Sequence, residues 1–384
     1  MPALRAVILS AIVLLGCTAN GDASNNDAAV SNAAAQSGGR PFQVAELARF
    51  EEPWAMALLP GGRQALITEK AGRLKLWTVG GEAIDVAGVP SVDYGGQGGL
   101  GDVIVHPDFA NNNIVYLSWA EAGEGDTRGA AVGRGRLAVA GSAARLEDFQ
   151  VIWRQQPKMS GRGHYGHRLL FSPDGRHLFI SNGDRQHFDP AQDMNASLGK
   201  ILRLNPDGSV PEDNPFAGQG GIAAQIWTLG HRNPLGIAFA PDGRLWEVEM
   251  GPAGGDEMNL IVRGRNYGYP IVSNGDHYDG RDIPDHETRP DFEAPKISWT
   301  PVISPGDMII YSGDMFPQWR GDALIAGLSG QALLRVDIDG DSAREANRWP
   351  MEERIREVEQ APDGSIYLLQ DGEAGRLLHL TAAR

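Results

Sequence analysis

The feature of this chain that most constrains its fold is a short turn signature that recurs between residues 59 and 364. Its clearest copies read Pro-Asp-Gly, in which proline fixes φ and Asp-Gly favours a tight turn. Apolar runs flank most copies, as at 169–171 and 178–180, so each unit predicts a strand, a turn and a second strand. The signature and its variants stand at 59–62, 106–109, 172–175, 240–243, 316–319 and 361–364.

The spacing of these turns predicts the architecture. Successive copies are separated by roughly 45–75 residues, which is typical of the blades of a β-propeller. The six copies predict an all-β, six-bladed β-propeller, and the 50 glycines agree with many short strands joined by turns. A similar turn at 205–208 is interpreted as a hairpin within the third blade. Seven blades is the alternative count, and a pair of β-sandwiches would explain the strands but not the repeat.

Charge and cysteine content exclude several functions. The formal net charge is −15, so no basic stripe is available for a phosphate backbone and no nucleic-acid partner is expected. Acidic side chains could instead hold a hard cation such as calcium, which prefers oxygen ligands. The single cysteine, Cys17, rules out an intramolecular disulfide and a cysteine-based zinc site.

The N-terminus predicts export. Arg5 followed by the apolar run 6–15 is typical of a signal peptide, and the run is too short for a comfortable membrane span. The run ends in Gly16-Cys17 like a lipobox, which predicts a lipid anchor on Cys17; an ordinary secretory signal cut a few residues later is the alternative. We therefore divide the chain into a signal peptide (1–17), a small polar linker (18–40) and a propeller domain (41–384) that faces the periplasm.

The stretch 230–259 concentrates polar residues at both ends of one expected hairpin. Arg232 and Asn233 precede an apolar strand, and a glycine-rich loop that opens with Gly251-Pro252 follows the next strand. Exposed carbonyls beside two carboxylates in this loop suit calcium, although the spacing is not that of an EF-hand. The stretch therefore predicts a binding site on a β scaffold.

Two histidines, His164 and His167, lie in a glycine-rich loop just before the expected strand 169–171. Imidazole is the side chain best matched to proton abstraction near neutral pH, so a general base is one interpretation. A surface-loop histidine is the plainer one. Metal binding is a third, but no further ligand stands at a familiar spacing.

Other polar groups lie near expected strand ends. Gln97 is the one side chain in the glycine run 95–99 able to contact a ligand, although a plain turn between blades is the simpler explanation of the run taken alone. Arg354 and Arg356 lie on one face of a strand, where two guanidinium groups could clamp a polycarboxylate; an edge strand with solvated charges is the alternative. The segment 182–185 is an insertion loop with acidic and amide groups, or a turn capped by them.

Seven motifs stand in the order seen in the glucose/sorbosone dehydrogenase family, and they most resemble the bacterial soluble aldose sugar dehydrogenases that use pyrroloquinoline quinone (PQQ). The resemblance extends from about Phe42 to the C-terminus. The motifs are those at 52–60, 96–100, 163–169, 230–234, 251–257, 266–270 and 354–358.

The resemblance implies a propeller with PQQ over its central face. It also implies a dehydrogenase activity. An aldose would be oxidised at the anomeric carbon to the lactone, with hydride passing to the quinone and electrons leaving to an external acceptor. His164 would be the general base, and Arg232 would steady the developing negative charge. PQQ would be held by Gln97, Arg232, Asn233, Tyr278 and Arg354 or Arg356. One calcium would bind the carbonyls of Gly251 and Pro252, and a second, structural calcium would bind Glu257 and the Tyr267 region.

Three positions depart from the family pattern. Gly163 stands where Asp or Asn often precedes the catalytic histidine, so what orients His164 is open. Leu328-Ser329-Gly330 align with a common lysine, and His167 replaces a usual glycine. A calcium-dependent propeller lactonase and a non-catalytic propeller binding module are the alternatives to the dehydrogenase.

Overall fold

The computed structural model of this protein describes residues 39–383. Cys17, the predicted signal peptide and nearly all of the predicted linker lie outside the described residues. Residues 39–383 form an all-β fold of the propeller type, with 24 strands, one four-residue helix (α1, Phe109–Asn112) and five single turns of 3-10 helix. The expected strands beside the Pro-Asp-Gly turns are confirmed.

Four of the five sheets contain four antiparallel strands each. The turn at 205–208 lies between β12 and β13 of one sheet, which confirms its assignment to a hairpin inside a single unit. The four sheets are β10 (Leu169–Phe171), β11 (Leu178–Asn182), β12 (Lys200–Leu204) and β13 (Ile226–Leu229); β14 (Pro234–Phe239), β15 (Leu245–Glu249), β16 (Asp256–Ile261) and β17 (Ile297–Trp299); β18 (Pro305–Ile310), β19 (Ala323–Gly327), β20 (Ala332–Asp339) and β21 (Ser342–Pro350); and β22 (Ile355–Gln360), β23 (Ile366–Gln370), β24 (Gly375–Ala382) and β1 (Phe42–Phe50).

The fifth sheet has eight strands and consists of two four-stranded halves. The halves are joined only by a short parallel pairing of β5 with β9, at Val86 with Ala144 and Ala87 with Arg145. Its strands are β2 (Pro53–Leu58), β3 (Gln64–Glu69), β4 (Arg73–Thr78), β5 (Ala83–Ala87), β6 (Leu100–Val105), β7 (Ile114–Ala122), β8 (Arg128–Ala140) and β9 (Ala143–Arg154).

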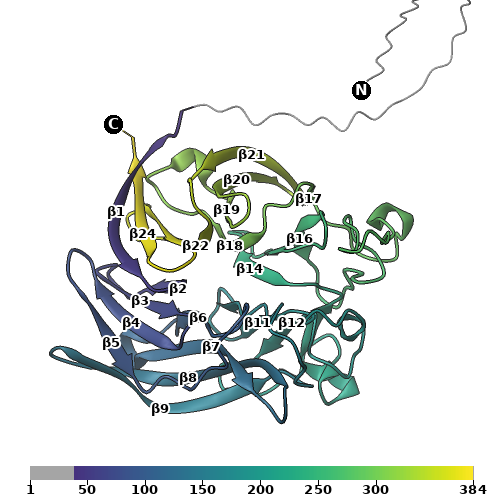
Figure 1. Cartoon of the computed structure of the whole chain (residues 1–384), viewed down its shortest axis with the longest axis horizontal. Helices are drawn as coiled ribbons and strands as arrows, with labels where there is room; N and C mark the ends of the chain where they lie inside the picture. Colours follow the sequence, from purple (N-terminus) through teal and green to yellow (C-terminus); the bar gives the residue numbers. More distant parts are fainter. Residues whose placement is uncertain (1–38, 384) are drawn as a thin grey trace, which may run out of the picture. The chain divides into compact units, whose positions relative to one another are not determined.

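The first described strand and the last one belong to the same sheet. β1 pairs antiparallel with β24 from Phe42 with Ala382 to Phe50 with Gly375, and the two lie side by side in Figure 1. The leading strands of successive units also touch in sequence: β2 contacts β6, β6 contacts β10, and so on through β14, β18 and β22, which returns to β2. The two ends of the described chain are therefore held together by backbone pairing.

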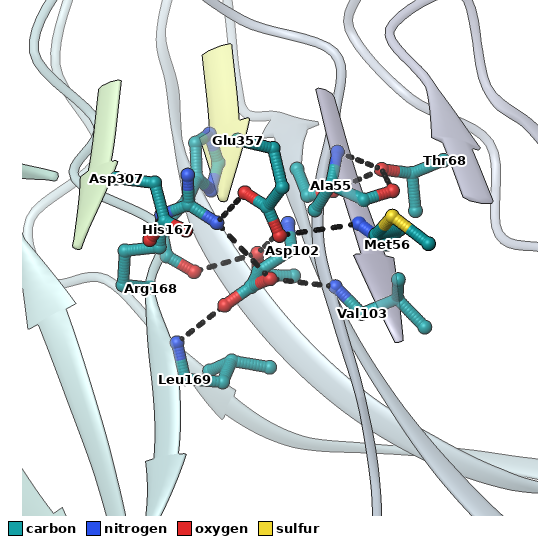
Figure 2. Close-up of polar contacts among 12 residues, drawn as sticks. Ala55, Met56, Thr68, Asp102, Val103, His167, Arg168, Leu169, Asp307 and Glu357 are labelled. Atoms are coloured by element: carbon teal, nitrogen blue, oxygen red, sulfur yellow. Dashed lines mark hydrogen bonds and ion pairs between the residues drawn. The ribbon is translucent and has the colours of Figure 1, made fainter. Parts of the chain in front are cut away.

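Arg168, immediately before β10, is the charge at the centre of this ring of strands (Figure 2). Its side chain is 4% exposed, and Nη1 donates to Glu357 Oε2 at 2.6 Å. Two further carboxylates lie close, with Asp307 Oδ1 3.4 Å from Nε and Asp102 Oδ1 3.5 Å from Nη1. Burial raises the pKa of all three carboxyl groups, and Arg168 opposes that shift by stabilising their charged forms.

The same guanidinium group also ties backbone from other units. Its Nε donates to the carbonyl of Leu235 at 2.7 Å, and its Nη2 donates to the carbonyl of Gly306 at 2.6 Å. The carboxylates extend the network, because Glu357 Oε1 accepts from the amide of Met56 at 3.2 Å. Through these bonds Arg168 connects β2, β6, β10, β14, β18 and β22, so the centre of the ring depends on one buried charge.

Replacing Arg168 with methionine should destabilise the protein strongly. The substitution leaves buried carboxylates without their cation, which typically costs about 3–5 kcal/mol. The matched control is Arg176→Met, because the Arg176 side chain is 77% exposed and pairs only with Asp174 on a surface turn; a change below about 0.5 kcal/mol is expected there. Urea unfolding measures both, and equal midpoints for Arg168→Met and the wild type would contradict this account.

Candidate functional site

A buried His–Asp pair lies in two loops of the β10–β13 sheet. His164 comes from the loop between β9 and β10, and Asp184 follows β11. His164 Nδ1 lies 2.6 Å from Asp184 Oδ1, and both side chains are at most 5% exposed. The backbone amide of Gln186 also donates to Asp184 Oδ1 at 2.9 Å. The carboxylate therefore holds a proton on Nδ1 and leaves Nε2 as the basic nitrogen of the ring.

The pair shows which residue orients His164 when glycine stands at position 163. A Cβ at Gly163 would lie 2.3 Å from Gln186 Oε1, so an aspartate there would require the side chain of Gln186 to move. Asp184 orients the imidazole instead, from a loop that the sequence marked only as acidic. Gln97 supports the backbone of the same loop, because its Oε1 accepts from the amide of His164 at 2.7 Å.

The electrostatic surroundings keep His164 uncharged near neutral pH. Burial lowers the pKa of His164, the hydrogen bond to Asp184 raises it in part, and the guanidinium of Arg232 lowers it again. The net shift is downward from the usual value of 6.5. A neutral imidazole with a fixed tautomer can accept a proton on Nε2.

Arg232, in the loop between β13 and β14, faces a group of oxygen atoms. Its Nη1 donates to the carbonyls of Met250 at 2.9 Å and Gly251 at 2.6 Å, and its Nη2 donates to Tyr278 Oη at 3.1 Å. Its Nε is buried and has no hydrogen-bond partner among residues 39–383. The structure thus brings the predicted residues Arg232, Gly251 and Tyr278 together. One N–H donor of the guanidinium group, Nε, has no acceptor among the described residues.

Glu249, at the end of β15, positions this loop and was not predicted from the sequence. Its Oε2 accepts from the backbone amides of Arg232 at 2.5 Å and Asn233 at 3.1 Å. Asn233 in turn accepts the amide of Gly166 through Oδ1 at 3.1 Å, which links this loop to the loop of His164. The alternation of acidic and apolar residues at 246–249 was the available signal, but Glu247 and Glu249 are both buried, and only the hydrogen bonds in space show that Glu249 holds the Arg232 loop.

The predicted residues line two neighbouring cavities. A cavity of about 250 Å³ is bordered by Gln97, Asn233, Arg354 and Arg356, together with Trp54. A second cavity of about 220 Å³ is lined by residues that include His164, Arg232, Pro252 and Tyr278. Adjacent residues, Arg232 and Asn233, border one cavity each, so the two spaces meet at this dipeptide.

The first cavity carries a pair of arginines, but only Arg356 lies in β22; Arg354 immediately precedes the strand, and the pairing with β23 shifts register between Ile355 and Glu357. Arg354 Nε donates to Asp371 Oδ2 at 2.8 Å, and Arg356 Nη2 donates to Asp371 Oδ1 at 3.0 Å. Burial opposes ionisation of Asp371, but Arg356 and Arg354 outweigh it and hold its pKa at about 2. Two guanidinium groups against one carboxylate leave a net positive wall, which suits an anionic ligand.

The residues predicted to hold a structural calcium surround a histidine. His286 Nε2 lies 3.0 Å from the carbonyl oxygen of Tyr267, and its Nδ1 lies 3.7 Å from Glu257 Oε1. The imidazole thus contacts both predicted ligands, and all three residues border one small cavity. Asp256, at the start of β16, accepts hydrogen bonds from backbone amides. Its Oδ1 accepts from the amide of Gly251 at 2.8 Å, and its Oδ2 accepts from the amide of Ser304 at 2.6 Å.

In the part of the chain that the structure covers, no helix is long and apolar enough to cross a membrane. The structure thus combines a buried His–Asp pair with a neighbouring arginine-walled cavity on a propeller-type fold, an arrangement typical of an enzyme active site. Comparison with known proteins makes this assignment more specific.

The family model of glucose/sorbosone dehydrogenases matches residues 50–379. The aldose sugar dehydrogenase YliI of Escherichia coli K12 is 39% identical over 339 residues, covering 87% of this chain and 91% of that protein. A crystal structure of a glucose dehydrogenase superposes with a TM-score of 0.85 at 44% identity, covering 89% of this chain and all of that one. The PQQ-bound aldose sugar dehydrogenase of Streptomyces coelicolor superposes with a TM-score of 0.73 at 27% identity, covering 89% and 98% of the chains.

The chain belongs to the glucose/sorbosone dehydrogenase family, and it is an oxidoreductase. This family membership was expected from the seven motifs and is confirmed.

The His164–Asp184 pair predicts a titration that NMR can follow. His164 should titrate below 6.5, and Asp184→Asn should lower its pKa further, because the carboxylate raises the pKa by stabilising the imidazolium. Asp189→Asn, on an exposed position of the same loop, should leave the titration unchanged. A His164 pKa that stays the same or rises in Asp184→Asn would contradict the arrangement.

Proposed function

We propose that this protein is a PQQ-dependent aldose sugar dehydrogenase that oxidises the anomeric carbon of an aldose to the lactone. The observation that carries the proposal is the neutral His164, held by Asp184 beside Arg232 and next to the arginine-walled cavity. The names of the similar proteins, among them a PQQ-bound aldose sugar dehydrogenase, support the same chemistry.

We also propose that the propeller has six blades. The ring of contacts among six leading strands supports this count, with the eight-stranded sheet divided into two blades at its short parallel junction. The pairing of β1 with β24 would then complete the sixth blade from both ends of the domain.

The residues of the larger cavity fit PQQ, a flat tricarboxylic acid. Arg354 and Arg356 offer guanidinium groups to carboxylates, and Lys70 lies at the same wall, where it pairs with Glu52 at 3.4 Å. Trp54 and the amide groups of Gln97 and Asn233 supply an aromatic and polar lining. We propose that these residues hold the cofactor, with Tyr278 closing the site through its hydrogen bond to Arg232.

The chain's own residues handle the proton and the developing charge. His164 Nε2 takes the proton of the anomeric hydroxyl, and Asp184 stabilises the imidazolium that forms. The guanidinium group of Arg232, which lines the same cavity as His164, would stabilise the oxygen that gains negative charge. PQQ, when bound, supplies the two-electron acceptor for the hydride of the anomeric carbon. The electrons then leave to an external acceptor.

The two expected calcium sites differ in what surrounds them. At the first, Pro252 borders the cavity of His164, and the carbonyl of Gly251 accepts from Arg232 Nη1 at 2.6 Å, so calcium bound at these two carbonyls would replace the guanidinium group on Gly251. Bound there, calcium would act as a Lewis acid toward the quinone. At the second, the imidazole of His286 already contacts both Glu257 and the carbonyl of Tyr267, so we propose that it competes with calcium for these ligands.

This difference predicts the calcium content. Protein reloaded with calcium and PQQ and then desalted should retain one ion per chain, and His286→Ala should retain two, because it frees the Tyr267 carbonyl and Glu257. His177→Ala, on a turn of the β10–β11 hairpin, should still retain one. Elemental analysis measures the ratio, and two ions in the wild type would contradict the assignment to His286.

We propose that the protein is exported to the periplasm and attached to a membrane only by a lipid on Cys17. The apolar run 6–15 and the lipobox-like Gly16-Cys17 support this proposal, and both lie outside the described residues. Mass spectrometry of the mature N-terminus tests it.

Reconstitution separates this function from its alternatives. Dye reduction with aldoses should require both PQQ and calcium, because neither the base nor the arginines can accept electrons. A propeller lactonase would instead hydrolyse lactones with calcium and no PQQ, and a binding module would do neither. Aldose-dependent dye reduction that persists without PQQ, or fails with it, would overturn the proposal.

His164→Ala tests the base within the reconstituted enzyme. Loss of a general base typically lowers kcat by about 10²–10⁴-fold. PQQ affinity should stay within a few-fold, because His164 lines the other cavity. His177→Ala serves as the control that keeps full activity. Unchanged turnover in His164→Ala would remove this residue from the mechanism.

A further inference from the structure

Arg185, the residue after Asp184, is a buried cation that the proposed mechanism does not use. It is 1% exposed. No carboxylate among residues 39–383 forms an ion pair with its guanidinium group, and the adjacent Asp184 pairs with His164 instead. Burial lowers the pKa of Arg185, but a guanidinium group stays charged far above neutral pH. Because a buried charge without an ionic partner is costly, other contacts must compensate it.

The guanidinium group finds these contacts in one loop. Its Nη1 donates to the carbonyl of Gly163 at 2.8 Å, and its Nη2 donates to the carbonyl of Gly161 at 2.7 Å. Its Cζ lies 3.7 Å from the centroid of the Tyr165 ring, which is a cation–π contact. Gly163 and Tyr165 flank His164, so one side chain holds the main chain on both sides of the predicted base.

The backbone of Arg185 adds a contact with the base itself. Its amide donates to the carbonyl of His164 at 3.2 Å. His164 and Arg185 both have left-handed backbone conformations, with φ of 48° and 58°, which residues with side chains rarely adopt. Such conformations persist only where the surrounding contacts fix them, and they concentrate at functional sites. The three carbonyl contacts of Arg185 supply that constraint for the loop of His164.

Asp184 and Arg185 hold different parts of His164. Asp184 fixes the imidazole through Nδ1, whereas Arg185 fixes the main chain that carries the imidazole. Arg185 lines neither the cofactor cavity nor the cavity of His164, so it does not touch a ligand in either space. Its charge also acts on the base: burial, Arg232 and Arg185 each lower the pKa of His164.

We propose that Arg185 is a positioning residue for the general base, whose guanidinium fork and backbone amide hold the main chain of 161–164 and so fix where the imidazole of His164 borders its cavity. The inference rests on the proposed function, since the step that it serves is the proton transfer to His164 named there. Position matters because a misplacement of about 1 Å can lower a rate about 10²-fold.

The first test replaces Arg185 with methionine, which removes the fork and the charge but keeps an unbranched side chain against Tyr165. The kcat of the reconstituted enzyme should fall about 10–100-fold. The KM for the aldose and the Kd for PQQ should stay within about threefold, because Arg185 lines neither cavity. Arg176→Met, on an exposed surface turn, is the matched control and should keep full kcat.

Hydrogen–deuterium exchange of the cofactor-free protein measures the loop itself. Loss of the fork in Arg185→Met should speed exchange of the amides at 161–166, while the amides of β11 and β12 keep their wild-type protection. A residue needed only for folding would instead speed exchange throughout this sheet and leave the kcat of the folded fraction unchanged, which would contradict the proposal.

Arg185→Lys serves if the methionine variant does not fold. Lysine keeps a cationic donor but loses the planar fork and its stacking on Tyr165. Its kcat should still fall, by less than in Arg185→Met, with the same local rise in exchange at 161–166.

The outcomes separate the two proposals. A folded variant of either kind with wild-type kcat and wild-type exchange at 161–166 would overturn the role of Arg185 and leave the proposed function standing. A wild type without PQQ-dependent turnover would overturn the proposed function, and the base-positioning role of Arg185 with it.

Discussion

The ion-pair network of Arg168 is the interaction on which the rest of the structure depends. A buried guanidinium is tolerated only where carboxylates and carbonyls surround it, and here its partners come from leading strands all around the ring. The network therefore specifies which strands meet at the centre. It also anchors the loop 163–168, which carries His164 at one end and Arg168 at the other. The base occupies a defined position because the far end of its loop is tied to the core of the fold.

The site follows from this arrangement, since its parts come from the ends of strands in neighbouring units. His164 precedes β10, Asp184 follows β11, and Arg232 precedes β14. Glu249, at the end of β15, holds two backbone amides of the Arg232 loop, and Asn233 bonds that loop to Gly166. Proton acceptor, cation and anion-binding wall thus share a rigid frame, which is what preorganised catalysis requires.

Local patterns in the sequence predicted most of the fold. The Pro-Asp-Gly turns indicated strands because turn chemistry and apolar runs act over a few residues. The pairing of β1 with β24 was not predicted, since it joins segments at opposite ends of the described chain and β1 has no turn signature before it. The role of Arg168 was hidden for the same reason, because Asp102 lies 66 positions away and Glu357 lies 189 positions away.

The site was also predicted only in part: local patterns in the sequence revealed some of its residues, and contacts between distant segments determine the others. His164, Arg232 and the paired arginines were recognised from motifs and strand periodicity, and the structure brings them to adjoining cavities. Asp184 was seen only as a loop acid, and His286 was not singled out, because their partners are set by packing between loops.

A crystal structure of the protein with PQQ tests the central claim most directly. The quinone acid should lie in the cavity of Arg354, Arg356, Gln97 and Asn233, next to His164; a quinone bound elsewhere, or absent at saturating PQQ and calcium, would contradict the account.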